Sequence, residues 1–185
     1  MNCCFLTVET RTSAELPRCV LLKPGSVNSS TGLHLPDFQL HLPALSGTRR
    51  RGRIWFYINK GWCTDVTVLK KSCSPHLESL FINCRPFYSP WEFSSFILVG
   101  VYIPPQACVT EALQQLADQI TDMERKHPDS LLIVLGDFNG ANLSRQLPRY
   151  RQHVKCPTRD KNTLDHCFKA VVPNWSGFRT HHHLL

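Results

Sequence analysis

Apolar residues occur along this chain in short runs that are separated by polar or proline-containing segments. Short runs rich in aromatic and β-branched residues are typical of β-strands. They predict strands at Cys3–Val8, Ile54–Ile58, Asp65–Leu69, Leu77–Cys84, Ser95–Ile103, Leu131–Leu135 and Thr163–Phe168. From about residue 10 to 50 the chain is rich in Pro, Ser, Gly and Leu without a clear period, which predicts loops and short pieces.

One segment between two of these strands has helical spacing. Its apolar residues recur three or four positions apart, as on the buried face of an amphipathic helix: Leu113, Leu116, Ile120 and Met123. Thr110 is placed to cap this helix and Glu111 to interact with its first turn. Pro128 should end it just after Lys126. Strands, a helix and then further strands predict a mixed-sheet α/β or α+β domain.

The most informative segment is the apolar run 131–135 with the polar residues that follow it. The run is typical of a strand buried on both faces, and after Gly136 come Asp137 and Asn139, two positions apart. In an extended chain such residues point to the same side, and a carboxylate beside a carboxamide can orient a water or reach a metal-bound phosphate. The alternative is a hairpin turn at Asn139-Gly140, although the next residues do not alternate like a returning strand.

Composition narrows the class of protein. The 185 residues are 42% hydrophobic and 19% charged, which indicates one globular domain with a core. No apolar run approaches the roughly 20 residues of a membrane span, and no signal peptide is evident, so we expect a nuclear or cytoplasmic protein. Nine cysteines without a Cys-x-x-Cys motif favour buried reduced thiols. The alternative of a zinc site at His153, Cys156, His166 and Cys167 matches no common zinc spacing.

The formal charge of +7 suits a polyanionic partner such as nucleic acid. The densest basic run lies at 49–53, where a solvated loop is an equally good interpretation. A second basic region follows the Asp137 strand directly, and we expect it to bind nucleic acid. Its residues are Arg145, Arg149, Arg151, Lys155, Arg159 and Lys161.

Four short motifs follow one another along the chain. They are Trp-Phe-Tyr-Ile-Asn-Lys-Gly-Trp-Cys at 55–63 with Leu-Glu-Ser-Leu-Phe-Ile-Asn-Cys-Arg-Pro at 77–86, Val-Tyr-Ile-Pro-Pro at 101–105, Gly-Asp-Phe-Asn at 136–139 and Thr-Leu-Asp-His at 163–166. Together they resemble the endonuclease/exonuclease/phosphatase superfamily. The first motif is most similar to the endonuclease domain of vertebrate non-LTR (LINE-type) retrotransposons. The likeness is dense from about residue 52 to 168 and thinner before it.

This resemblance implies a sandwich of two mixed β-sheets flanked by helices, an active site at one edge, and cleavage of DNA phosphodiesters with Mg²⁺, or Mn²⁺ in its place. It implies that Asp137 positions or deprotonates the attacking water, that Asn139 holds this water or the phosphate, and that Tyr102 hydrogen-bonds the phosphate. Asp165 is similar to the acid that orients a catalytic histidine. The adjacent His166 should face the other way, because neighbouring strand residues point to opposite faces.

Other parts of the pattern differ from the family. Glu9 matches the metal-binding acid best, although an exposed acid near the terminus is an equal alternative, and Arg11 stands where the retrotransposon domains have Trp. Pro105 replaces an asparagine of the related repair enzymes. No Ser-Asp-His motif follows Asp165, and we do not expect the histidines at 181–183 to be catalytic, since no aspartate precedes them. The spacing also implies that one strand is missing from each end.

We therefore expect a truncated endonuclease/exonuclease/phosphatase domain at residues 1–170 and an unrelated tail at 171–185. The expected function is that of a Mg²⁺-dependent, DNA-nicking retrotransposon endonuclease, monomeric and ancestrally fused to a reverse transcriptase, with weak or no activity in this chain. The alternatives are a non-catalytic nucleic-acid-binding remnant that uses the basic region, and a phosphatase of the same superfamily.

Overall fold

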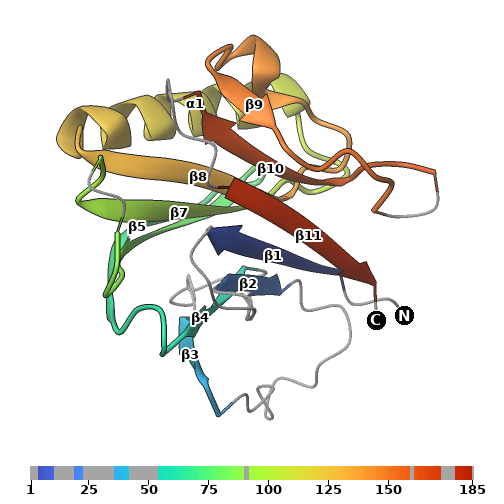
Figure 1. The fold of residues 1–185 in the computed structure, drawn as a ribbon. Coiled ribbons are helices and arrows are strands. Elements are labelled where there is room, and N and C mark those ends of the chain that lie inside the picture. Colours follow the sequence, from blue (N-terminus) through green and yellow to red (C-terminus); the bar gives the residue numbers. More distant parts are fainter. Residues whose placement is uncertain are drawn as a thin grey trace.

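The computed structural model describes residues 4–10, 19–22, 36–41, 54–89, 92–158, 161–171 and 178–184, with backbone alone at 4–10, 19–22, 40–41 and 178–184. In this part of the chain two β-sheets pack face to face, and one long helix covers the outer face of the larger sheet (Figure 1). The predicted class, an α/β domain built as a sandwich, is confirmed.

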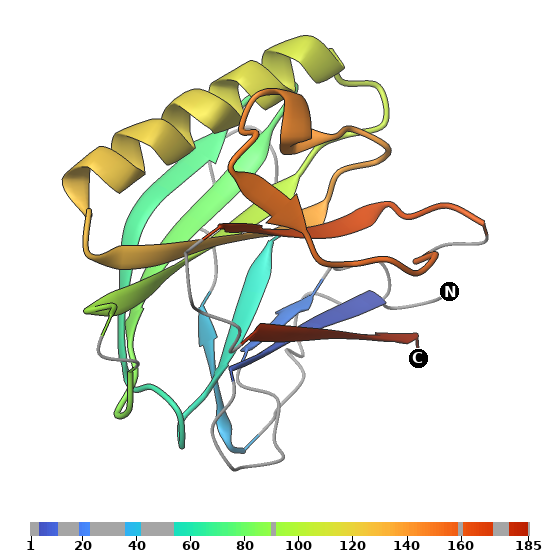
Figure 2. The ribbon, with the colours of Figure 1, turned by 45° about the horizontal axis from the view of Figure 1, so that its top comes forward.

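The smaller sheet has five strands in the described residues, in the order β11-β1-β2-β4-β3, and all neighbouring pairs are antiparallel. Its strands are β1 (Cys4–Thr10), β2 (Cys19–Leu22), β3 (Phe38–His41), β4 (Trp55–Asn59) and β11 (Phe178–Leu184). The sequence predicted β1 and β4. The short pieces expected between residues 10 and 50 include two four-residue strands, β2 and β3, and β11 pairs with β1 along its whole length (Figure 2). The domain boundary at residue 170 stays a prediction.

The larger sheet has six strands in the described residues, in the order β5-β6-β7-β8-β10-β9, and only β7 and β8 are parallel. The crossover between these two strands is the helix α1, as a parallel pair requires. The elements are β5 (Asp65–Cys73), β6 (Glu78–Arg85), β7 (Ser95–Tyr102), α1 (Val109–Lys126), β8 (Ser130–Asp137), the 3-10 helix η1 (Leu143–Arg145), β9 (Tyr150–Gln152) and β10 (Asp165–Ala170). No helix in the described part of the chain has the length and apolar character needed to cross a membrane.

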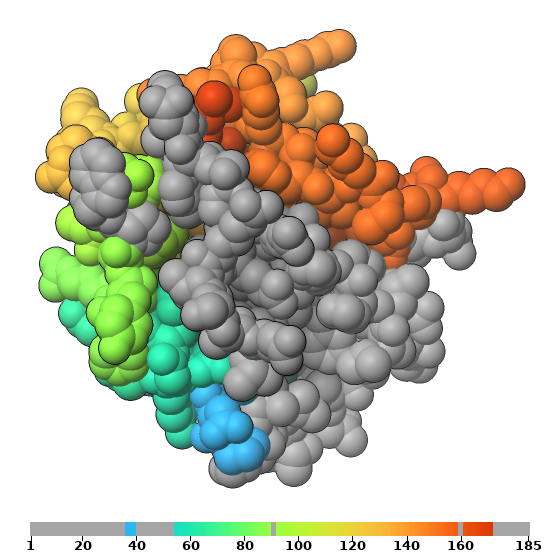
Figure 3. All heavy atoms as spheres, in the orientation of Figure 1, coloured from blue at the N-terminus to red at the C-terminus, as the bar shows by residue number. Residues whose placement is uncertain are grey.

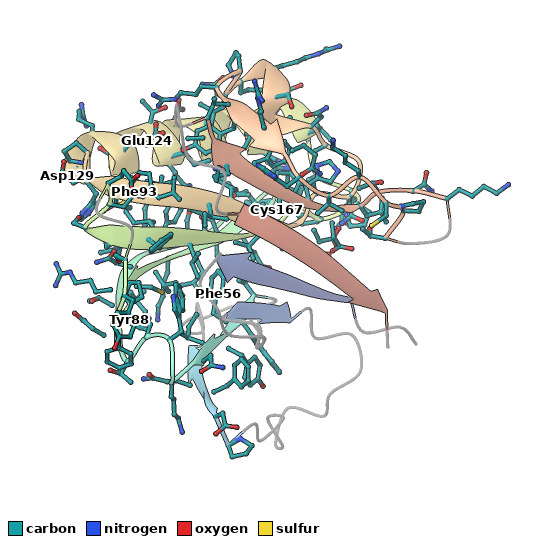
Figure 4. All side chains as sticks on the ribbon, viewed as in Figure 1. Phe56, Tyr88, Phe93, Glu124, Asp129 and Cys167 are labelled. Atoms are coloured by element: carbon teal, nitrogen blue, oxygen red, sulfur yellow. The ribbon has the colours of Figure 1, made fainter. Side chains whose placement is uncertain are left out.

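Two apolar layers hold the fold together. The inter-sheet core contains Phe56 of β4 and Cys167 of β10, both labelled in Figure 4. A Cβ on Gly100 would lie 2.4 Å from Cγ2 of Ile54 and 3.0 Å from Cε2 of Phe56, so the sheets approach closely where β7 has no side chain. The second layer lies beneath α1 and contains the four apolar helix residues that the spacing predicted.

The start of α1 differs from the prediction. The helix begins at Val109 after Cys108, so Thr110 is not its cap. The backbone N–H of Cys108 donates instead to Nδ1 of His76, at 3.1 Å, and Nε2 of His76 lies 3.2 Å from the carboxylate of Glu111. A distant loop residue therefore satisfies a helix-end donor that the local sequence assigned to a threonine.

Candidate active site

Four polar side chains form one row across the larger sheet, which we call the carboxylate row: Glu78, Tyr102, Asp137 and Asp165. Glu78 pairs directly with Tyr102, Tyr102 with Asp137, and Asp137 with Asp165. Directly opposed residues of neighbouring strands share a face of the sheet, and their strands lie about 4.8 Å apart. Tyr102 and Asp137 end their strands while Glu78 and Asp165 begin theirs, so the whole row lies at one end of the sheet.

The row faces the smaller sheet. Tyr102 belongs to the inter-sheet core, as do Leu135 and Cys167, which lie two positions from Asp137 and Asp165 along their strands. All four members are buried, with exposed fractions of 6% for Glu78, 6% for Tyr102, 4% for Asp137 and 8% for Asp165. Burying carboxylates is costly, and three of them in one row serve no purpose in apolar packing. Such groupings are typical of functional sites.

Glu78 is the member of the row that the sequence analysis missed. Its strand was predicted, but an acid at the start of an apolar run looks like an exposed strand end. The strand pairing places Glu78 in the row, because Glu78 lies directly opposite Tyr102, on the side away from Asp137. Only the strand order, which brings β6, β7, β8 and β10 side by side, reveals it.

Asp137 and Asn139 are held together, but not in the way that was predicted. Asn139 has a φ of 46°, so it is left-handed rather than extended. Its backbone N–H donates to Oδ1 of Asp137, at 3.1 Å, and its side-chain Nδ2 donates to the carbonyl of Ile103, at 2.7 Å. The turn at Asn139-Gly140, which the alternative interpretation proposed, does form, since Ala141 N–H donates to the Phe138 carbonyl at 2.9 Å. The chain does not return as a hairpin, because β8 lies between β7 and β10.

Asp165 is placed beside Asp137 by a buried threonine that the sequence analysis also missed. The hydroxyl oxygen of Thr158 accepts the backbone N–H groups of Leu164, at 2.9 Å, and of Asp165, at 3.0 Å. The Leu164 carbonyl in turn accepts from the backbone N–H of Phe138, at 2.8 Å. These bonds join the start of β10 to the end of β8.

His166 lies on the opposite face, as the strand alternation predicted. Its ring stacks on Phe138, with 5.1 Å between centroids and 16° between planes, and its Nε2 lies 3.0 Å from the Thr163 carbonyl. Burial lowers the pKa of His166, and the Thr163 contact and the charge of Asp165 oppose this effect. The buried imidazole packs on Phe138, which belongs to the core beneath α1, and it does not reach the carboxylate row.

Several predicted residues lie outside what the structure describes. Glu9 is in β1, where its backbone pairs with that of Arg179, but its side chain is not among the described ones. The same holds for the three histidines at 181–183 in β11, and Arg159 is outside the described residues altogether. The roles assigned to them stay predictions.

The basic residues after β8 do not all belong to one surface. The guanidinium of Arg149 forms an ion pair with Glu124 of α1, the acid labelled in Figure 4, and Tyr150 Oη donates to the same carboxylate at 2.7 Å. Arg149 is therefore directed to the helix side of the sheet. Four other predicted nucleic-acid-binding residues are exposed: Arg145, Arg151, Lys155 and Lys161.

The oxygen donors of the row suit a hard cation. Mg²⁺ is usually held by one or two carboxylates, water and substrate phosphate. The described residues contain no group of three or more His, Cys, Asp or Glu side chains that could hold a metal ion. By chemical type, the carboxylate oxygens of the row fit Mg²⁺.

The sequence of this chain matches no family model and no curated protein. Its structure is similar to that of a humanized D. rerio TDP2 with 14 mutations, at a TM-score of 0.50 and 12% identity, covering 76% of this chain and 64% of that one. The fold resembles that of TDP2.

Two further solved structures are similar. One is D. rerio TDP2 complexed with a single-strand DNA product, at a TM-score of 0.48 and 10% identity, covering 75% of this chain and 64% of that one. The other is an endonuclease/exonuclease/phosphatase family protein from Bacteroides thetaiotaomicron, at a TM-score of 0.47 and 9% identity, covering 73% and 61%. This chain spans less than two thirds of the length of these proteins.

Proposed function

We propose that this chain is a metal-dependent phosphodiesterase domain that acts on DNA, derived from the nicking endonuclease of a non-LTR retrotransposon. The observation that carries the proposal is the carboxylate row, because it unites three acids and a phenol from four strands at one end of the sheet. The sequence motifs that resemble the endonuclease/exonuclease/phosphatase superfamily supply Tyr102, Asp137 and Asp165 of this row.

In the proposed reaction, the carboxylate of Asp137 orients a water and accepts its proton while the water oxygen forms a bond to phosphorus. The bond from phosphorus to the 3′ oxygen breaks, the phosphate stays on the 5′ side, and the 3′ oxygen leaves as an alkoxide that takes a proton from solvent water to become the 3′-hydroxyl. Asn139 fixes Asp137 through its backbone N–H, and the second hydrogen of its side-chain amide is available for the phosphate or the water. The phenol of Tyr102 donates to a phosphate oxygen.

We propose that Glu9 holds Mg²⁺, or Mn²⁺ in its place, and that the bound ion neutralises charge on the phosphate oxygens. Asp165 would orient a histidine in this superfamily, but the sequence has no Ser-Asp-His motif after it, and the neighbouring His166 faces the other core. A missing general acid lowers a rate by about 10²- to 10⁴-fold. The proposal is therefore one of weak activity.

A plasmid-nicking assay tests the proposal. Supercoiled plasmid is incubated with the chain and Mg²⁺, with Asp137→Ala as the test variant and Asp118→Ala, an exposed acid on α1, as the control. We expect slow nicking that EDTA abolishes, that Asp137→Ala reduces at least about 10²-fold and that the control variant retains. Equal rates in the parent and Asp137→Ala chains would overturn the assignment of Asp137. Rapid nicking would contradict the proposed weakness.

A second candidate is a non-catalytic nucleic-acid-binding domain, which the exposed basic residues after β8 favour. DNA binding that weakens with salt, in the absence of any Mg²⁺-dependent nicking, would select it. Release of phosphate from inositol phosphates, measured in the same preparation, would select the phosphatase alternative instead.

A further inference from the structure

A cluster of basic side chains borders the carboxylate row on its β10 side. Lys169 of β10 pairs directly with Arg151 of β9, so the two share one face of the sheet. Asp165, Cys167 and Lys169 are every second residue of β10, so their side chains share one face of the sheet. Cys167 belongs to the inter-sheet core. Lys169 is therefore on the face that carries the row and is buried, while Arg151 is exposed.

Two more basic residues complete this cluster, which we call the β9–β10 basic cluster: Arg151, His153, Lys155 and Lys169. The backbone N–H of His153 donates to the Cys167 carbonyl at 2.8 Å, which continues the strand pairing beyond the end of β9. Burial lowers the pKa of His153, and the charges of Lys169, Lys155 and Arg151 lower it further. All three cations are thus close enough to His153 to act on it electrostatically.

The cluster differs from the broad basic region that the sequence indicated. It includes Lys169 and His153, which the sequence analysis did not select for nucleic-acid binding. It excludes Arg149, whose guanidinium is paired with Glu124 on the helix side of the sheet. The segment that follows β8, drawn in orange in Figure 3, forms a continuous surface on the side of the molecule shown there.

We infer that the β9–β10 basic cluster binds a backbone phosphate of the DNA strand whose reacting phosphate lies at the carboxylate row. This inference rests on the proposed function for the position of the reacting phosphate. Lys169 follows Asp165 by four residues of extended strand, which is about 14 Å at roughly 3.4 Å per residue. Because one DNA strand carries a phosphate about every 3.4 Å along the helix axis, the cluster and the row contact different phosphates.

The test is a binding measurement in EDTA, so that it does not depend on cleavage. Fluorescence anisotropy of a labelled DNA duplex is recorded over a series of NaCl concentrations for the parent chain, Arg151→Gln and Lys169→Gln. Matched controls are Arg125→Gln and Lys126→Gln, which make the same charge changes at exposed residues of α1 that pair with Asp122.

Each lost phosphate contact should reduce the slope of log K against log salt by about 0.9. A change of about 0.9 in this slope changes the binding constant about eightfold over a tenfold range of salt concentration. We therefore expect both cluster variants to bind DNA about eightfold more weakly than the parent chain at 0.1 M NaCl. The controls should change the affinity by less than about twofold. Because Lys169 is buried, Lys169→Arg is included as a variant that keeps the positive charge, and it should bind DNA like the parent chain. Arg151→Gln tests the loss of a charge from the same cluster at an exposed position.

Cluster variants that bind like their matched controls would overturn the inference, even if the parent chain binds and nicks DNA. A parent chain whose binding does not depend on salt would overturn it as well. If the cluster variants lose affinity while the parent chain shows no nicking, the cluster stands as a phosphate site and the proposed phosphodiesterase activity falls.

Discussion

Gly136, which precedes Asp137, should be far less tolerant of a side chain than Gly140, which follows Asn139. Both glycines have a positive φ, 149° at Gly136 and 86° at Gly140. A Cβ on Gly136 would lie 1.9 Å from the carbonyl oxygen of Val101 and 2.8 Å from its carbonyl carbon and its nitrogen. At Gly140 a Cβ would meet nothing within 4 Å. Alanine at the two positions therefore separates a backbone clash from conformational strain.

The expected difference can be estimated from these contacts. A positive φ costs an alanine about 1–3 kcal/mol at each position, and at Gly136 the clash adds to this cost. The clash at Gly136 is with backbone, and relieving it requires β8 to move away from β7. Overpacking of this kind costs about 1–3 kcal/mol, and each weakened ladder hydrogen bond adds about 1 kcal/mol. We expect Gly136→Ala to lower the free energy of unfolding by about 2–4 kcal/mol more than Gly140→Ala does.

Urea unfolding followed by far-UV circular dichroism measures this difference directly. Equal loss of stability in the two variants, within about 0.5 kcal/mol, would refute the reasoning, since it would mean that β8 does not approach β7 as closely as the structure has it. The same preparations can be used in the nicking assay. If Gly136→Ala remains folded at low temperature, it should lose activity even so, because Asp137 moves with the strand.

Three further predictions concern the surroundings of the site. Thr158→Val should cost about 1–3 kcal/mol of unfolding free energy, because two backbone N–H donors at the start of β10 lose their acceptor; Thr158→Ser keeps the acceptor and should cost less than about 1 kcal/mol in the same urea assay. Tyr150→Phe removes the 2.7 Å bond to the Glu124 carboxylate and should lower stability by about 1–2 kcal/mol, and an unchanged urea midpoint would contradict the role of that bond. Burial lowers the pKa of His166, so protonation of this side chain favours the unfolded chain. The contribution of neutral His166 to the free energy of unfolding is present above the unfolded pKa of about 6.5, and it is lost as the pH falls through that value towards the folded pKa. The free energy of unfolding should therefore decline as the pH falls below about 6.5, and His166→Gln should show a smaller decline, whereas an identical decline would exclude His166 as its source.

The central part of the fold could be predicted from the sequence because its local signals are strong. The apolar runs of the larger sheet and the helical spacing of α1 each exceed what a loop would show, and the structure has strands and a helix at these places. The short strands β2 and β3 have four residues each, and they exist because β4 and β1 offer backbone partners. Their sequences, Cys-Val-Leu-Leu and Phe-Gln-Leu-His, are too short to predict a strand by themselves, so pairing partners distant in the chain decide their conformation.

The sequence predicted single residues of the candidate site, but it did not predict how they are arranged. The Asp137 strand end stands out in the sequence, and the family resemblance adds Tyr102 and Asp165. The position of Glu78 depends on strand order and register, which no local pattern carries. The same is true of Thr158, whose hydroxyl acts on residues six and seven positions away, and of the ion pair that takes Arg149 away from the other basic residues.

The concentration of unfavourable local features at the end of β8 supports a functional interpretation of the row. Within five positions the chain has a glycine with no room for a side chain, a buried acid, a left-handed asparagine and a second glycine with positive φ. Among the described residues Asn139 is the only non-glycine with a positive φ. The other buried acids among the described residues of this sheet, Glu78 and Asp165, belong to the same row. Where a chain departs from its local rules in one place and follows them around it, stability alone does not account for the departure, and the geometry of a site does.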